Sequence, residues 1–149
     1  MSGPGSWEGQ INLLWDGESG GEISIKNHPT IKLDTPIEYG GNGRYPCPDE
    51  FFLSAIGGCL LTTFLYFKRK VKLHLEELQI SVSGKVNLVG PKGYRVTDLK
   101  GVIRVKTSKD EKVNAKKCIE WAKNYCHITH ALTVPIKLSA EISSEEETT

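Results

Sequence analysis

The sequence lacks a Cys-x-x-Cys pair, a glycine-rich nucleotide fingerprint and an excess of charge of either sign. Without Gly-x-Gly-x-x-Gly or a Walker loop, no motif supports a nucleotide site. The formal net charge of +1 gives no electrostatic argument for nucleic acid as a partner. The segment Met1 to Trp7 contains Ser, Gly and Pro where a secretory leader needs an apolar stretch, so we expect a reducing, cytoplasmic compartment.

Length and composition are those of an ordinary globular protein. With 38% hydrophobic and 25% charged residues, the chain is close to the average for soluble proteins and unlike a disordered segment. Its 149 residues can bury one sizeable core, which excludes a miniprotein held together by disulfides. No repeat or linker interrupts the pattern, so we expect a single domain over residues 1–149.

Alternating apolar and polar residues predict strands in both halves of the chain. The predicted strands cover residues 7–15, 23–25, 31–33, 78–88, 99–105 and 134–142. Asp16-Gly17 is typical of a hairpin turn, and the Gly-Pro-Lys-Gly segment at 90–93 separates two antiparallel strands. Pro135 cannot donate to a ladder, so the last strand is expected at a sheet edge.

Two helices complete the predicted α+β fold. Residues 49–70 begin with two carboxylates and end with three cations, which suits the dipole of one long helix. Ser108 and Glu111 have capping-box spacing and predict a second helix that runs to about Tyr125. Between the N-terminal strands and the long helix, residues 35–48 hold three prolines and three glycines and are expected to form a loop.

The long helix is apolar on all sides. Residues 51–67 are 17 positions without a charge, which is the lower limit for a membrane span of about 17 to 25 residues. Small and hydroxyl residues within the run, and strands that need an apolar cover, favour a buried helix without a membrane. Gly57 and Gly58 favour close approach of a second chain, so we expect a twofold dimer that buries paired helices.

Three motifs stand along the chain: Pro48-Asp49-Glu50, Gly58-Cys59 in the helix and the late Cys126-x-Ile128-x-x-Ala131-Leu132. As a set they resemble the motifs of the OsmC/Ohr family of osmotically inducible and organic hydroperoxide resistance proteins. The resemblance covers nearly the whole chain. It implies antiparallel sheets packed around a long buried helix, in an intertwined homodimer. Glu38-Tyr39-Gly40-Gly41 is more similar to a less characterised OsmC-like branch.

The resemblance also implies an activity and its residues. It implies a peroxidase of the antioxidant stress response, which reduces small organic hydroperoxides at the expense of a dithiol reductant and needs no cofactor. Cys59 would be the peroxidatic thiol and Cys126 the resolving thiol, with Glu50 as the carboxylate. Arg44, the only arginine before the helix, would be the cation. The alternative is a non-catalytic OsmC-like dimer that binds a small apolar molecule.

The chemistry requires an activator for Cys59. A free thiol has a pKa near 8.5 and only its thiolate attacks a peroxide bond. In a straight helix Glu50 and Cys59 are about 13.5 Å apart on opposite faces. Either the glycine pair breaks the helix and gives Cys59 a fresh N-terminus, or the site forms across subunits. A cation is needed in both cases, with Arg44 the first candidate and His127 the second.

The remaining thiols and histidines have weaker interpretations. Cys118 shares a helix face with Cys126, and this position predicts that Cys118 packs in the core. Cys47 and His130 receive no role. A zinc site built from Cys118, Cys126, His127 and His130 would need unwinding, because eight helical residues span about 12 Å. We expect instead that Cys59 and Cys126 lie within disulfide reach, with Cα atoms at about 7 Å or less. Phe51, Phe52, Ile56 or Leu60 would wall an apolar pocket.

Overall fold

The structure, a computed structural model, describes residues 5–145, so the first four residues of the segment examined for a leader lie outside it. The chain divides into two compact units, Met1–Phe51 and Phe52–Thr149. The elements of the first unit are β1 (Ile11–Trp15), β2 (Gly20–Ile25), β3 (Ile31–Asp34), the 3-10 turn η1 (Ile37–Tyr39) and the first residues of α1 (Pro48–Val71). The second unit holds the rest of α1, then β4 (Leu75–Leu88), η2 (Gly90–Lys92), β5 (Tyr94–Thr107), η3 (Lys109–Glu111), α2 (Lys112–Tyr125), α3 (His127–His130) and β6 (Ile136–Ser143).

The first unit is an antiparallel sheet in the order β1-β2-β3. The hairpin turns where Asp16-Gly17 predicts it, and Gly17 has φ +87°, a conformation that favours glycine. All five residues of β1 are exposed, and four of them are Ile11, Leu13, Leu14 and Trp15. Both faces of this apolar strand are therefore uncovered within the first unit.

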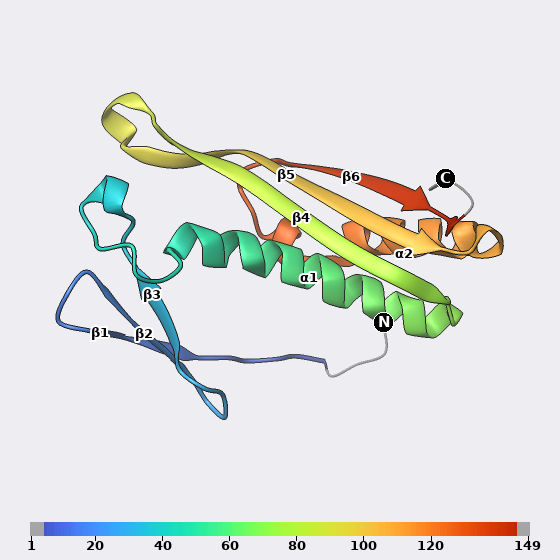
Figure 1. Ribbon diagram of the computed structural model, residues 1–149, viewed down its shortest axis with the longest axis horizontal. Coiled ribbons are helices and arrows are strands. Elements are labelled where there is room, and N and C mark those ends of the chain that lie inside the picture. The colour runs from blue at the N-terminus through green and yellow to red at the C-terminus, as the bar shows by residue number, and fades with distance from the viewer. Residues whose placement is uncertain (1–4, 146–149) are drawn as a thin grey trace. The chain divides into compact units, whose positions relative to one another are not determined.

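The second unit is a three-stranded sheet in the order β4-β5-β6, with helices on one face (Figure 1). The predicted antiparallel pair is confirmed and is longer than expected, since β4 and β5 have 14 residues each. The edge position of β6 is also confirmed. However, β6 pairs with β5 in the parallel direction, which the alternation of residues 134–142 did not indicate. A parallel partner needs a crossover, and α2 supplies it.

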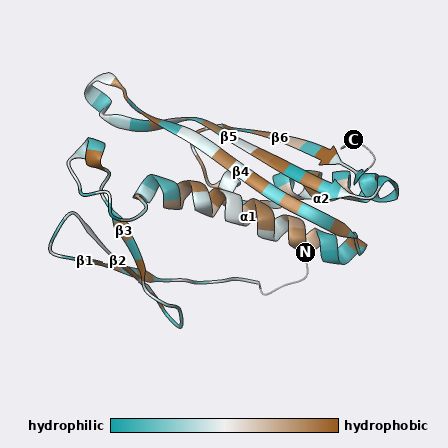
Figure 2. Cartoon of the chain, viewed as in Figure 1, coloured by the Kyte–Doolittle hydropathy of each residue, from teal (hydrophilic) through white to brown (hydrophobic). Residues whose placement is uncertain are grey.

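The core lies between this sheet and the two helices α1 and α2. Figure 2 shows the alternating hydropathy of the strands and the apolar length of α1. The buried cluster combines residues from α1, β5 and α2 with flanking positions: Ile56, Cys59, Leu60, Phe64, Leu73, Leu99, Ile103, Val105, Ala115, Cys118, Ile119, Ala122 and Cys126. Cys118 packs in this cluster, as its helix face predicts. Both helices therefore bury apolar stripes against one face of the sheet.

α1 is one unbroken helix, so the alternative in which the glycine pair breaks it is wrong. The two glycines differ in their surroundings. A Cβ on Gly57 would lie 3.2 Å from Val82 Cγ2, whereas nothing lies within 4 Å of a Cβ on Gly58. Close packing with β4 of the same chain accounts for Gly57. Gly58 faces open space in the single chain.

By length and composition α1 could cross a membrane, and it alone could do so among the helices of residues 5–145. Its stripe of Ile56, Cys59, Leu60 and Phe64 belongs to the buried core, which is the role expected of a central helix in a soluble protein. The start of α2 differs from expectation. Ser108 makes no side-chain cap hydrogen bond, because a 3-10 turn precedes the helix and Glu111 is the residue before it.

The two glycines predict different responses to alanine. At concentrations where the chain is monomeric, Gly58→Ala should raise the free energy of unfolding by up to about 1 kcal/mol, because alanine favours helix and the new methyl meets no atom. Gly57→Ala, the matched control, should gain less or lose stability against Val82. Urea unfolding followed by circular dichroism measures both. Equal gains would contradict the packing assigned to Gly57.

Candidate functional site

The structure brings together two of the four predicted site residues, Cys59 and Cys126. Cys59 lies on the buried stripe of α1, and Cys126 ends α2 and precedes α3. Both thiols are free and buried, with exposed fractions of 6% for Cys59 and 0% for Cys126. The Cys126 side chain lies within hydrogen-bonding reach of the Cys59 thiol. Two thiols that are 67 positions apart in the sequence therefore meet in the second unit.

The backbone around Cys126 fixes this meeting point. Its N–H donates to the carbonyl of Ala122, which closes the last turn of α2. Its ψ of 101° then turns the chain, and its carbonyl accepts hydrogen bonds from the His130 N–H at 3.2 Å and the Thr129 hydroxyl at 2.9 Å. The direction of α3 is thus set at Cys126, and the first residues of α3 face the Cys59 thiol.

Three groups besides Cys126 surround the Cys59 Sγ. The Thr63 Oγ1 lies 4.0 Å away on the next turn of α1, and the His127 Nδ1 lies 3.8 Å away. The backbone N–H of Ile128 also points to the sulfur as a hydrogen-bond donor. The helix N-terminus expected from a break in α1 is therefore replaced by the first turn of another helix.

The pKa of Cys59 is raised in these surroundings. Burial is the main cause, because it disfavours the charged thiolate, and the neighbouring Cys126 raises the pKa further. The Ile128 N–H and the Thr63 hydroxyl act in the opposite direction, since both can donate to a thiolate. Burial, the Cys126 thiol, the Ile128 N–H and the Thr63 hydroxyl together do not give Cys59 the lowered pKa of an activated thiol.

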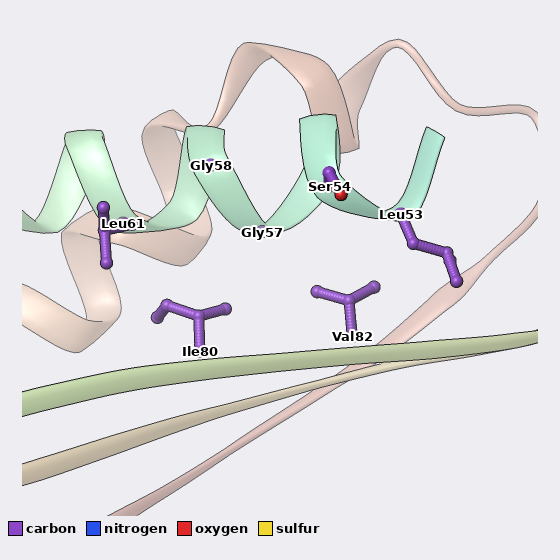
Figure 3. A pocket seen from close by; sticks show the side chains of 7 residues that line it. All are labelled: Leu53, Ser54, Gly57, Gly58, Leu61, Ile80 and Val82. Carbon is purple, nitrogen blue, oxygen red and sulfur yellow. The ribbon is translucent and has the colours of Figure 1, made fainter. Parts of the chain in front are cut away.

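A groove whose lining side chains are mostly apolar runs between α1 and β4 (Figure 3). Its volume is about 380 Å³, and it is lined by Leu53, Ser54, Gly57, Gly58, Leu61, Ile80 and Val82. Ile80 and Val82 point from β4 toward the helix. The expected walls Ile56 and Leu60 are fully buried in the core instead, because their face of α1 packs on the sheet, so they cannot line an open pocket.

Glu50 caps the start of α1. Its Oε1 accepts a hydrogen bond of 3.0 Å from the backbone N–H of Cys47, and the Cys47 carbonyl accepts the N–H of Glu50. This is the glutamate half of a capping box, with a backbone carbonyl in place of the N-cap side chain. Hydrogen bonds from Cys47 lower the pKa of Glu50, and the one from the Cys47 backbone N–H has the largest effect. The sequence offered this signal in the glutamate that follows Pro48 at the helix start.

Arg44 is held by three carboxylates of the first unit. Its guanidinium lies 2.6 Å from Asp16 Oδ2, 2.6 Å from Glu18 Oε2 and 2.7 Å from Asp34 Oδ2. Asp34 is fully buried, and it also accepts the backbone N–H of Arg44 at 3.0 Å and the Ser19 hydroxyl at 2.6 Å. The pKa of Asp34 is therefore well below its ordinary range, with Arg44 as the main cause. This cluster ties the β1-β2 turn and β3 to the loop before α1.

The remaining candidate residues, His130 among them, all lie in the described part of the chain and form no second site. His130 Nε2 lies 2.7 Å from the carbonyl of Asn124. Within residues 5–145 no three side chains among His, Cys, Asp and Glu are placed to hold a metal ion. Sequence reasoning missed Thr63 and the Ile128 N–H, because only the turn at Cys126 directs the chain back to α1. It named His127 but gave no reason for contact with Cys59.

The cluster around Asp34 predicts a loss of stability in acid. Because the folded-state pKa of Asp34 is depressed, the unfolded chain takes up the proton first as the pH falls. The contribution is complete above the ordinary value of 3.8 and is lost progressively below it. Arg44→Ala and Asp34→Asn should lower amide protection in β2 and β3 at neutral pH and flatten this acid dependence. Hydrogen exchange of the β2 and β3 amides, recorded at neutral and at acid pH, measures both the protection and its acid dependence.

The control for these variants is Asp98→Asn, at an exposed carboxylate whose cation partner, Lys85, is 3.9 Å away. An exposed pair of this kind contributes little to stability, so its loss should leave β2 and β3 unchanged. Equal acid sensitivity of the wild type and Asp34→Asn would contradict the role given to Asp34.

The chain is similar to known proteins along nearly its whole length. Residues 40–141 match the family model described as OsmC-like protein. The uncharacterized protein YmaD of Bacillus subtilis (strain 168) is 28% identical over 141 residues, which cover 93% of this chain and 89% of YmaD.

Solved structures show the same α+β fold. An OsmC like protein from Mycoplasma pneumoniae has a TM-score of 0.76 at 15% identity, covering 91% of this chain and 97% of that chain. An organic hydroperoxide resistance protein OsmC from Legionella pneumophila has a TM-score of 0.67 at 19% identity, with coverage of 91% and 97%. The family model spans more than half of the sequence. The chain therefore belongs to the OsmC-like protein family.

Proposed function

We propose that the protein reduces small organic hydroperoxides, with Cys59 as the peroxidatic thiol and Cys126 as the resolving thiol. The observation that carries the proposal is the meeting of these two free, buried thiols from distant parts of the chain. The similar Legionella pneumophila protein is an organic hydroperoxide resistance protein by name, which supports the substrate class. We further propose that both units act as one OsmC-like domain in a reducing cytoplasm, where thiols persist.

The proposed reaction balances over two thiols and one peroxide. The Cys59 thiolate attacks the terminal oxygen of the hydroperoxide, so an S–O bond forms and the O–O bond breaks. The alkoxide that leaves takes up a proton and becomes an alcohol, and Cys59 becomes a sulfenic acid. The Cys126 thiol then attacks this sulfur, an S–S bond forms and water leaves. An external dithiol returns the disulfide to two thiols by exchange.

Glu50 and Arg44 complete the site in this proposal, as the family resemblance implies. The contacts of Arg44 in the first unit decide which substitution can test its catalytic role. Arg44 faces three carboxylates, so the cluster as a whole does not present a free positive charge. Arg44→Ala is expected to disturb the first unit, and Arg44→Lys is the better variant for a catalytic test because it keeps one charge.

A binding protein without catalysis is the second candidate. Two observations favour it: the open apolar groove between α1 and β4, and the raised pKa of Cys59. In this alternative the groove holds a small apolar molecule and the thiols are structural. The two candidates differ in whether a hydroperoxide oxidises Cys59.

Oxidation by one equivalent of cumene hydroperoxide should distinguish them. In the wild type, intact-mass spectrometry should show loss of two hydrogens, and peptide mapping should join Cys59 to Cys126. In Cys126→Ser the same treatment should leave a sulfenic acid that dimedone traps. Cys47→Ser is the control, because this half-buried thiol is not one of the two that the proposed disulfide joins, and serine keeps a hydroxyl beside Glu50.

A preference for organic peroxides is part of the same expectation. A pocket that buries alkyl groups gains roughly 0.8 kcal/mol for each methylene, so stopped-flow oxidation by cumene hydroperoxide should be faster than by hydrogen peroxide. Unchanged thiols after treatment, with folded protein, would leave the binding protein as the function.

We also propose that the protein is a homodimer. Within the second unit Gly58 faces open space on α1, and within the first unit β1 exposes apolar side chains on both faces, so a second copy would cover surfaces that each unit by itself leaves open. The resemblance to the family supports this arrangement.

Sedimentation equilibrium at micromolar concentration should therefore give twice the chain mass of 16.5 kDa. Leu14→Asp, at a β1 residue that is 71% exposed, should weaken association at least tenfold, because it places a charge in an apolar contact. Val113→Asp changes an equally apolar α2 residue that is 68% exposed, and should leave the dimer intact. A wild-type monomer would contradict the proposal.

A further inference from the structure

His127 is an exposed residue beside a buried thiol. Its Nδ1 lies 3.8 Å from the Cys59 Sγ, although the two residues are 68 positions apart. The imidazole is open to water, whereas the sulfur is 6% exposed and Cys126 is fully buried. A side chain in this position can pass a proton between the buried sulfur and solvent.

The position of His127 is fixed by backbone hydrogen bonds. It is the first residue of α3, directly after Cys126 ends α2. Its carbonyl accepts the N–H of Ala131 at 3.1 Å, and the Thr129 hydroxyl binds the Cys126 carbonyl. These contacts hold the short turn that presents the imidazole to α1.

The groups that face the sulfur within the second unit make His127 the proton acceptor. They are the Thr63 hydroxyl, the Cys126 thiol, the Ile128 N–H and the His127 ring. Threonine does not titrate, and a buried thiol is a weak acid. Histidine changes its protonation near neutral pH, so its ring is the group able to accept a proton there. Acceptance at Nδ1 requires the tautomer with hydrogen on Nε2, and the His127 side chain is exposed.

We propose that His127 forms an acid–base pair with Cys59, taking the thiol proton at Nδ1 and holding the thiolate as an imidazolium. In the peroxidase reaction the same proton passes to the alkoxide when the O–O bond breaks, which yields the alcohol. This last step rests on the proposed function, but the pair itself does not. His127 thus supplies the cation that the chemistry of Cys59 requires.

The pair predicts a distinct dependence on pH. Burial and Cys126 raise the pKa of the Cys59 thiol, so without a partner its reactivity should rise only in alkaline solution. With an imidazolium beside it, the thiolate persists at lower pH, and reactivity should show a plateau through the neutral range. The plateau begins where the pair loses its first proton.

The test is the rate of Cys59 alkylation by iodoacetamide, followed by peptide mass spectrometry from pH 4 to 10. His127→Gln removes the base and keeps a polar side chain. His130→Gln is the matched control, because His130 lies in the same short helix but contacts the Asn124 carbonyl. Circular dichroism confirms that each variant is folded.

The wild type and His130→Gln should show the neutral plateau. His127→Gln should lose it, with alkylation at pH 7 at least tenfold slower, because an unpaired thiol is only a few per cent ionised there. Identical profiles for the wild type and His127→Gln would overturn the pair.

These readouts separate the pair from the peroxidase. Alkylation that depends on His127, in a protein that cumene hydroperoxide does not oxidise, supports the pair and removes the proposed function. Oxidation that proceeds with an unchanged pH profile in His127→Gln removes the pair and leaves the peroxidase standing.

Discussion

Packing of two helices on one face of the β4-β5-β6 sheet determines how the thiols meet. Since β6 runs parallel to β5, the chain must cross from one end of the sheet to the other, and α2 makes that crossing. The crossing helix buries its own stripe beside that of α1, so its end at Cys126 lies next to Cys59. The candidate site is therefore a product of topology, and it depends on the parallel strand at the sheet edge.

The ion-pair cluster around Arg44 lies in the first unit, and the two candidate thiols lie in the second. In the first unit the carboxylates of Asp16, Glu18 and Asp34 bind Arg44 and fix a loop of high glycine and proline content. Around Cys59 the polar side-chain contacts besides Cys126 come from the Thr63 hydroxyl and the His127 ring, and within the described part of the second unit no carboxylate or guanidinium is among them. In the proposed pair the cation beside the thiolate would form only by proton transfer from the thiol, whereas a guanidinium carries its charge permanently.

The sequence predicts much of the fold and less of the site. Residues 99–107 alternate strictly between buried and partly exposed positions, and the helix spacing in residues 112–125 is equally regular, so periodicity identifies both. Periodicity does not contain the direction of β6, because a half-buried strand alternates alike in parallel and antiparallel pairs. The pairing of Cys59 with Cys126 came from family resemblance, since no local pattern joins residues so far apart.

Oxidation of the two thiols would also change the connectivity of the chain. A bond between Cys59 and Cys126 closes a loop that contains β4, β5 and α2, and it spans 67 positions. In the chain-entropy model a loop of this length stabilises the folded state by about 4 kcal/mol, because it restricts the unfolded chain. The resting and oxidised forms would then differ in resistance to unfolding and proteolysis, so the redox state of the cell would set the lifetime of the protein as well as its reactivity.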